Sequence, residues 1–223
     1  AAKEWILDLI FPKICVGCGW EGSFVCETCA QKLVFSAPSC PVCSRRNFDG
    51  ILCDSCREKS GLRRFLAPFS YRDELIRNLI HAYKYEGVRE LKTYFAREMF
   101  KFISFYGVRL AREAIFIPIP LHRARERERG FNQARLLAEE LGQRLGLKVE
   151  NLLFRAHPTE QQIEMASFSK RRENVAGAVK VKDPAACIDQ TVILVDDVST
   201  SGATLYEAAR ALRGAGARTV WAI

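Results

Sequence analysis

Two kinds of apolar run alternate along this chain, one typical of buried strands and the other of amphipathic helices. Residues 192–195 form an unbroken apolar run rich in β-branched side chains, and residues 114–120 form a second run that contains two prolines. Such runs indicate strands that are covered on both faces of a parallel sheet. Because proline donates no ladder hydrogen bond, we expect the second strand to leave the sheet early. Further strands are expected at residues 67–71, 177–182 and 218–223.

Helical segments are indicated where apolar residues recur three and four positions apart. Asp73 is a suitable N-cap for a helix that ends near Gly87, and its apolar face comprises Leu75, Ile76, Leu79, Ile80 and Tyr83. Other helices are expected over residues 91–105, from Phe131 to about Leu145, and over residues 205–212. Strands that alternate with helices in this way predict an α/β fold with a mostly parallel sheet and helices on both of its faces.

The first sixty residues follow a different pattern, because eight of the nine cysteines lie there in four Cys-x-x-Cys pairs. The pairs are Cys15/Cys18, Cys26/Cys29, Cys40/Cys43 and Cys53/Cys56. A two-residue spacer lets both thiolates of a tight turn face one metal ion, and two such turns complete a tetrahedral site. Disulfides would suit a secreted protein, which nothing in the chain suggests. We therefore predict two structural Zn²⁺ sites that use all eight thiolates and leave no open position for catalysis.

The pairing of these cysteine turns has two possible forms. In the sequential form the first two turns bind one zinc ion and the last two bind the other, whereas the interleaved form pairs the first turn with the third. We prefer the sequential form, because each half then reads as a small ribbon. Residues 1–60 are interpreted as an N-terminal helix and a double zinc ribbon, and residues 61–223 as a second domain, with a linker at residues 61–64.

The formal net charge of +8 is unevenly distributed. Residues 1–60 contain seven basic and seven acidic side chains, so the whole excess lies in residues 61–223. A basic balance favours anionic partners, either substrates that carry pyrophosphate or nucleic acid. No apolar stretch is long enough to cross a bilayer and no signal-peptide pattern is present, so we expect a cytoplasmic protein without membrane insertion.

Two adjacent carboxylates, Asp196 and Asp197, follow the apolar run at residues 192–195 and precede a turn that opens the last helix. This 198–204 turn comprises Val198, Ser199, Thr200, Ser201, Gly202, Ala203 and Thr204. A strand, a small-residue turn and a helix N-terminus form an anion cradle, since free backbone N–H groups and the helix dipole face a phosphate. The aspartates would then lie beside ribose hydroxyls or a Mg²⁺ ion. No Gly-Lys-Ser/Thr follows a glycine-rich loop, which excludes a Walker-type nucleotide site.

This stretch resembles the phosphoribosyl-pyrophosphate (PRPP) motif of type I phosphoribosyltransferases, and the chain as a whole resembles the ComF family of competence-associated proteins. Four features carry the wider resemblance in order. They are the Leu9-Ile-Phe-Pro-x-x-Cys-x-x-Cys18 head, His81-Ala-Tyr-Lys-Tyr85, Pro118-Ile-Pro-Leu-His122 with Arg129-Gly-Phe-Asn-Gln-Ala134, and Gln162 with Arg171-Arg-Glu-Asn-Val175. The resemblance implies a type I phosphoribosyltransferase sheet with a small N-terminal double zinc ribbon.

The resemblance also implies a site. Asp196 and Asp197 are the expected catalytic residues, the 198–204 turn would hold the 5-phosphate end of PRPP, and Mg²⁺ would accompany PRPP. The cations expected to bind PRPP, mainly on its pyrophosphate side, are Lys84, Arg171 and those of a loop with alternating Arg and Glu at residues 123–129, in particular Arg123 and Arg129. Residues 162–174 would form a flexible lid that excludes water from the sugar cation.

Three functions follow as hypotheses. The first is a Mg-PRPP-dependent phosphoribosyltransferase of natural transformation, with an acceptor that the sequence does not name. The second is a factor that binds single-stranded DNA through its basic body. The third is a scaffold with PRPP as a regulatory ligand, which recruits a helicase-like competence protein. The acceptor-binding hood would come from residues 61–105 or from the zinc head.

Overall fold

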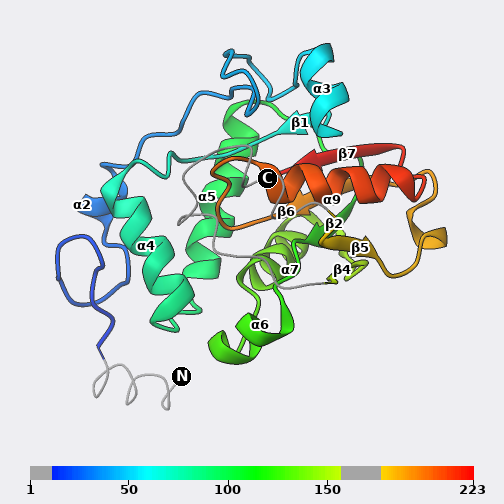
Figure 1. The fold of residues 1–223 in the computed structure, drawn as a ribbon. Helices are drawn as coiled ribbons and strands as arrows, with labels where there is room; N and C mark the ends of the chain where they lie inside the picture. The colour runs from blue at the N-terminus through cyan, green and yellow to red at the C-terminus, as the bar shows by residue number, and fades with distance from the viewer. Residues whose placement is uncertain (1–11, 157–176) are drawn as a thin grey trace.

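The computed structural model describes residues 12–156 and 177–223, and its centre is a parallel sheet (Figure 1). Five strands pair in the order β1-β7-β6-β2-β3, and every pairing is parallel. The strands are β1 (Arg64–Phe65), β2 (Ile115–Pro118), β3 (Lys148–Val149), β6 (Thr191–Val195) and β7 (Thr219–Ala222). The predicted α/β fold with a mostly parallel sheet is confirmed. The expected lid at residues 162–174, with Arg171, lies outside the described residues.

Helices fill the connections between the strands. The described helices are α2 (Glu27–Ala30), α3 (Asp54–Ser60), α4 (Glu74–Tyr85), α5 (Leu91–Phe105), α6 (Arg123–Arg129), α7 (Gln133–Leu145) and α9 (Ala203–Gly214), with a short 3-10 helix at Ala185–Cys187. The predicted cap is confirmed at Asp73, whose Oδ1 accepts a hydrogen bond from the Ile76 N–H at 3.0 Å. None of the described helices combines the length and apolar character that crossing a membrane requires.

The two faces of the sheet are covered by different helices. Ile193 and Val195 belong to a hydrophobic cluster that includes residues of α5 and α7. Val192 and Leu194 belong to a second cluster, which α9 completes on the opposite face. Every residue of β6 is buried, which explains why its sequence is an unbroken apolar run. Because both faces of β6 are buried, the strand ends at Val195 and the polar Asp196 follows directly after it.

The strand expected at residues 67–71 is wrong. The chain instead forms β1 at Arg64–Phe65, inside the segment interpreted as a linker. The Leu66 N–H donates to the Ala222 carbonyl at 2.9 Å and ends the pairing with β7. Pro68 follows without an N–H, so the pairing does not extend through it. Residues 67–69 and 71 run along the edge of a cavity instead.

The alternating Arg/Glu segment at residues 123–129, which we expected as a loop, forms helix α6. The His122 Nδ1 accepts a hydrogen bond from the Ala124 N–H at 3.3 Å, and Gly130 ends the helix with a φ of 74°. Arg, Glu and Ala are all good helix formers, so local propensity and the two ends are sufficient for one short helix.

The strand predicted at residues 177–182 is present as β5 (Val179–Val181), but it lies outside the parallel sheet. It pairs antiparallel with β4 (Leu153–Arg155) in a separate two-stranded sheet. This small sheet places Arg155 beside the C-terminal end of β2, where its Nε donates to the Pro120 carbonyl at 2.9 Å. The arrangement therefore brings a cation to the edge at which parallel sheets bind ligands.

Candidate active site

A polar cavity of about 140 Å³ opens at the C-terminal ends of β2 and β6. Its lining combines the acid pair, part of the 198–204 turn and several cations. The polar and charged lining residues are Lys84, Arg125, Arg129, Asn132, Gln133, Arg155, Asp196, Asp197, Thr200 and Thr204, together with Tyr71 and Tyr85. Side chains from α4, α6, α7, β4 and α9 thus converge on the point where β6 ends. This position is where open α/β sheets bind their ligands.

An ion pair lies at the centre of the cavity. The Lys84 Nζ is 2.8 Å from the Asp197 Oδ2, and both side chains are largely buried. Burial lowers the pKa of Lys84, but the charge of Asp197, a hydrogen bond to it and the charge of Asp196 raise it more strongly, so the pKa of Lys84 lies above its ordinary value. Lys84 is therefore a fixed cation in this cavity.

Asp196 has the more perturbed environment of the two acids. Burial, followed by the neighbouring charge of Asp197, raises the pKa of Asp196 to about 8, although Lys84 opposes the shift. The Asp197 N–H donates to the Asp196 Oδ1 at 2.9 Å and supports the ionised form in part. A ligand that brings hydrogen-bond donors or a cation stabilises the ionised form of such a buried acid.

This perturbation predicts a pH-dependent stability. Because folding raises the pKa of Asp196 above the value of about 3.9 in an exposed Asp, the favourable contribution of its proton is complete below pH 4 and is lost as the pH rises through about 8. The Tm of Asp196→Asn should therefore exceed the wild-type Tm by on the order of 3 °C or more at pH 9, with a smaller difference at pH 5.5. Thermal unfolding of zinc-loaded protein across this range measures the difference. The exposed control Glu128→Gln should show no such trend, and a difference independent of pH for Asp196→Asn would contradict the assignment.

The cationic side of the cavity is held by contacts within the chain. The Arg129 guanidinium lies 4.8 Å from the centre of the Tyr85 ring, and its Nη2 donates to the Tyr85 hydroxyl at 3.1 Å. Burial lowers the pKa of Arg155, while Asp196 opposes that shift. The Gln133 side chain is only 1 % exposed, yet its Nε2 has no hydrogen-bond partner among the described residues. A ligand oxygen in the cavity would satisfy this buried donor.

The 198–204 turn forms a smaller hollow against the polar cavity. This hollow is lined by Asp196, Val198, Ser199, Thr200, Gly202, Ala203, Thr204 and Leu205. Gly202 precedes α9 with a φ of 72°, a left-handed conformation that glycine adopts without strain. The turn leads directly into the N-terminus of α9, where backbone N–H groups and the helix dipole favour an anion.

The structure brings most of the predicted site residues together. Lys84, Arg129, Asp196, Asp197, Val198, Thr200 and Thr204 line the polar cavity, and Ser199, Gly202 and Ala203 line the adjoining hollow. Ser201 is buried and lines neither cavity, and its Oγ accepts from the Ala203 N–H at 3.4 Å. Arg123 lines a neighbouring hollow instead, since α6 turns it away from Arg125 and Arg129.

Two functional candidates were missed in the sequence, and a third was not singled out. Arg125 lies within the segment at residues 123–129 that was expected to bind pyrophosphate, and helical spacing would have separated it from Arg123. Gln133 lies in the 129–134 motif without a property that distinguishes it. Arg155 carries no local signal, because only the pairing of β4 with β5 brings it to the cavity.

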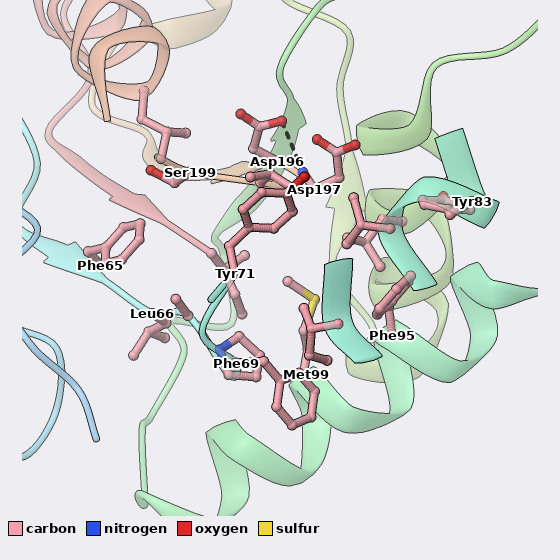
Figure 2. A pocket seen from close by; sticks show the side chains of 18 residues that line it. Phe65, Leu66, Phe69, Tyr71, Tyr83, Phe95, Met99, Asp196, Asp197 and Ser199 are labelled. Carbon is pink, nitrogen blue, oxygen red and sulfur yellow. Dashed lines mark hydrogen bonds between the residues drawn. The ribbon is translucent and has the colours of Figure 1, made fainter. Parts of the chain in front are cut away.

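A second cavity, of about 100 Å³ and mostly apolar, adjoins the acid pair (Figure 2). Figure 2 shows the carboxyl groups of Asp196 and Asp197 at one end and the side chains of Phe69 and Met99 toward the other. Its walls come from residues 65–69 and 71 and from α4 and α5. Tyr71, Asp196, Asp197 and Val198 line both cavities, so the apolar one adjoins the polar site.

The cysteines of the head form two compact groups. The Sγ atoms lie within 4.8 Å of one another in the group of Cys15, Cys18, Cys26 and Cys29 and in the group of Cys40, Cys43, Cys53 and Cys56. Sulfur–sulfur distances of 3.6 Å (Cys18–Cys26) and 3.7 Å (Cys43–Cys53) agree with the spacing of about 3.8 Å in a tetrahedral site with Zn–S bonds of about 2.3 Å. The donor set therefore fits two structural zinc ions, and the sequential pairing is confirmed over the interleaved one.

Comparison with known proteins agrees with both halves of this description. Residues 6–59 match the double zinc ribbon domain, and residues 129–223 match the phosphoribosyl transferase domain. The chain is 29% identical to competence protein ComFC of Bacillus subtilis over 203 residues, which cover 84% of this chain and 77% of that protein. It is 29% identical to competence protein F of Haemophilus influenzae (88% and 87% covered) and 27% identical to DNA utilization protein YhgH of Salmonella typhi (88% and 87% covered). The chain is therefore similar over most of its length to these competence and DNA utilization proteins, with a double zinc ribbon followed by a phosphoribosyl transferase domain.

Proposed function

We propose that this chain binds Mg·PRPP in the polar cavity and transfers the phosphoribosyl group to an acceptor. The observation that carries the proposal is the meeting of three features in one cavity at the end of β6: an acid pair, a hydroxyl-lined turn at a helix N-terminus, and the cations Lys84, Arg125, Arg129 and Arg155. The turn suits the 5-phosphate, the acids suit the ribose hydroxyls, and the cations suit the pyrophosphate.

The division of charge fits the chemistry of such a transfer. As the bond from C1 of the ribose to the pyrophosphate oxygen breaks, the leaving group takes the electron pair and the sugar acquires cationic character. Lys84 and Arg129 are already held in place, so they can stabilise the leaving group without reorganisation. Asp196 and Asp197 orient the ribose and offset the charge of the sugar. The hard carboxylate oxygens of this acid pair also suit Mg²⁺, which would neutralise the pyrophosphate when bound.

The apolar cavity is our candidate for the acceptor. It adjoins Asp196 and Asp197, and its aromatic lining favours a flat, weakly polar group. Because its walls come from residues 65–71 and from α4 and α5, the acceptor-binding hood would belong to residues 61–105 rather than to the zinc head.

The names of the relatives bear on the biological role of this chain but name no reaction. Two relatives are competence proteins and one is a DNA utilization protein, which supports a role in competence for this chain. The net charge of +8, all of it beyond residue 60, favours a second candidate function, in which the chain binds single-stranded DNA in the cytoplasm and PRPP acts as a regulatory ligand. A helicase-like competence protein is the proposed partner of the zinc head in either case.

Calorimetric titration of zinc-loaded protein with PRPP and Mg²⁺ tests the proposal. We expect a dissociation constant in the micromolar range, because the cavity offers several charge-assisted hydrogen bonds. Ribose 5-phosphate should bind more weakly and compete with PRPP, since it occupies only the turn. Absence of PRPP binding by folded, zinc-loaded protein would refute the proposal, and binding of single-stranded DNA that weakens steeply with salt would then favour the second function.

A further inference from the structure

Tyr206, in the first turn of α9, packs directly against the 198–204 turn. A Cβ added to Gly202 would lie 2.4 Å from the Tyr206 Cζ and 2.5 Å from its hydroxyl oxygen, so the ring rests on the bare backbone of Gly202. The Tyr206 N–H also donates to the Gly202 carbonyl at 2.9 Å. The side chain is only 8 % exposed. The position of this ring therefore limits the positions available to Gly202.

The same side chain adjoins the second zinc site. Tyr206 shares a hydrophobic cluster with Cys40 and Cys56, two ligands of that site, and with Leu52 and Leu62. Helix α3, which carries Cys56, packs against α9, and a Cβ added to Gly61 at the end of α3 would lie 3.4 Å from the Ala209 Cβ. The second ribbon thus belongs to the packing that surrounds Tyr206 and α9.

In the part of the chain that the structure describes, the first zinc site lies against a different helix. Its neighbour is α4, since a Cβ added to Gly17 would lie 2.8 Å from the Leu75 Cδ1 and 2.9 Å from the Cys29 Sγ. Figure 1 shows the same separation, with α2 of the first ribbon beside α4 and α3 of the second ribbon above β1 and α9. Among the described residues, the second ribbon therefore packs against α9, the helix that follows the proposed anion site, whereas the first ribbon packs against α4.

We propose that Tyr206 is a positioning residue that couples zinc in the second ribbon to the conformation of the 198–204 turn. Without zinc the four cysteine ligands lose the ion that holds them together. Helix α3, with 7 residues, is too short to persist alone. The packing around Tyr206 then loosens, the ring is free to leave Gly202, and the turn loses its support. The idea rests on the proposed function only in taking this turn as the phosphate site.

Hydrogen exchange on the full chain without PRPP tests the coupling separately from ligand binding. Cys43→Ser and Cys18→Ser are matched variants, because each removes an exposed ligand from one zinc site. We expect backbone amides 198–206 to exchange at least 10-fold faster in Cys43→Ser and at the wild-type rate in Cys18→Ser, with amides 192–195 of β6 unchanged in both. Zinc content measures the loss from each site. Equal effects of the two variants on the turn, or no effect of either, would overturn the proposal.

Variants of Tyr206 provide an independent test. No described residue offers the Tyr206 hydroxyl a hydrogen bond, so Tyr206→Phe should keep the ring contact and the slow exchange of the turn. Tyr206→Leu should speed exchange of the turn at least 10-fold while both zinc ions remain bound. Leu212→Ala removes a buried side chain from the same helix farther from the turn, so it controls for general loss of stability. If Leu212→Ala speeds exchange of the turn as much as Tyr206→Leu does, Tyr206 has only a structural role in the core.

Discussion

Replacing Asp196 and Asp197 together by asparagine is expected to lower the affinity for Mg·PRPP by at least 100-fold. Hydrogen bonds to charged groups contribute about 1.5–3 kcal/mol each, so losing two carboxylate acceptors removes roughly 3–6 kcal/mol of binding free energy. Lys84 also loses the charge of the partner that now holds it at 2.8 Å. The fold should persist, because Asn is nearly isosteric with Asp and, like the protonated form of Asp196 that its raised pKa favours at neutral pH, places no charge at this buried position.

Calorimetry under identical conditions measures this loss, with zinc content and thermal unfolding as checks on the fold. A matched control is Asp183→Asn with Asp189→Asn, since both acids are exposed and line none of the described cavities. Both double variants raise the net charge by two, which by itself favours an anionic ligand. A loss confined to the Asp196/Asp197 variant therefore has a local cause. If that variant binds within threefold of the wild type, the acid pair is not part of the PRPP site.

Much of the fold could be predicted because its strongest signals are local. The apolar run of β6 is buried on both faces, and the Asp73 cap and the spacing of apolar residues in α4 and α5 directly indicate the helices. The Cys-x-x-Cys turns likewise indicate two metal sites. The errors arose where local sequence is ambiguous. β1 has only 2 residues, and one of them is Arg64. The Arg64 guanidinium lies 4.4 Å from the centre of the Trp221 ring, a contact between distant residues that no local sequence pattern predicts.

The candidate site divides in the same way. The acid pair and the 198–204 turn are contiguous in sequence, so their chemistry could be inferred before their geometry was known. The opposite wall is assembled from separate elements: Lys84 comes from α4, Arg129 from α6 and Arg155 from β4. Their convergence depends on how helices pack on the sheet, which a single sequence does not specify. Lys84 and Arg129 were anticipated only through resemblance, and Arg155 was not anticipated at all.

Gly202→Ala is expected to abolish detectable binding of Mg·PRPP and to destabilise the protein. An alanine at a φ of 72° is strained by about 1–2 kcal/mol, and its Cβ would lie 2.4 Å from the Tyr206 Cζ. Tyr206 is enclosed by its own cluster, so it has little room to retreat, and overpacking of this kind typically destabilises by about 1–3 kcal/mol. We therefore expect the free energy of unfolding to fall by about 2–5 kcal/mol and the turn to change conformation.

Chemical unfolding measures the stability change, and Gly214→Ala in the same helix is the matched control. A Cβ at Gly214 meets no atom within 4 Å and its φ is negative, so that variant should be neutral or slightly stabilising. The double variant Gly202→Ala with Tyr206→Leu separates the two causes, because it relieves the overlap with the ring while the backbone strain remains. A favourable coupling energy of about 1–3 kcal/mol between the two positions is expected. Strict additivity would mean that ring and turn do not constrain each other, and the second zinc site would then have no route to the anion site through Tyr206.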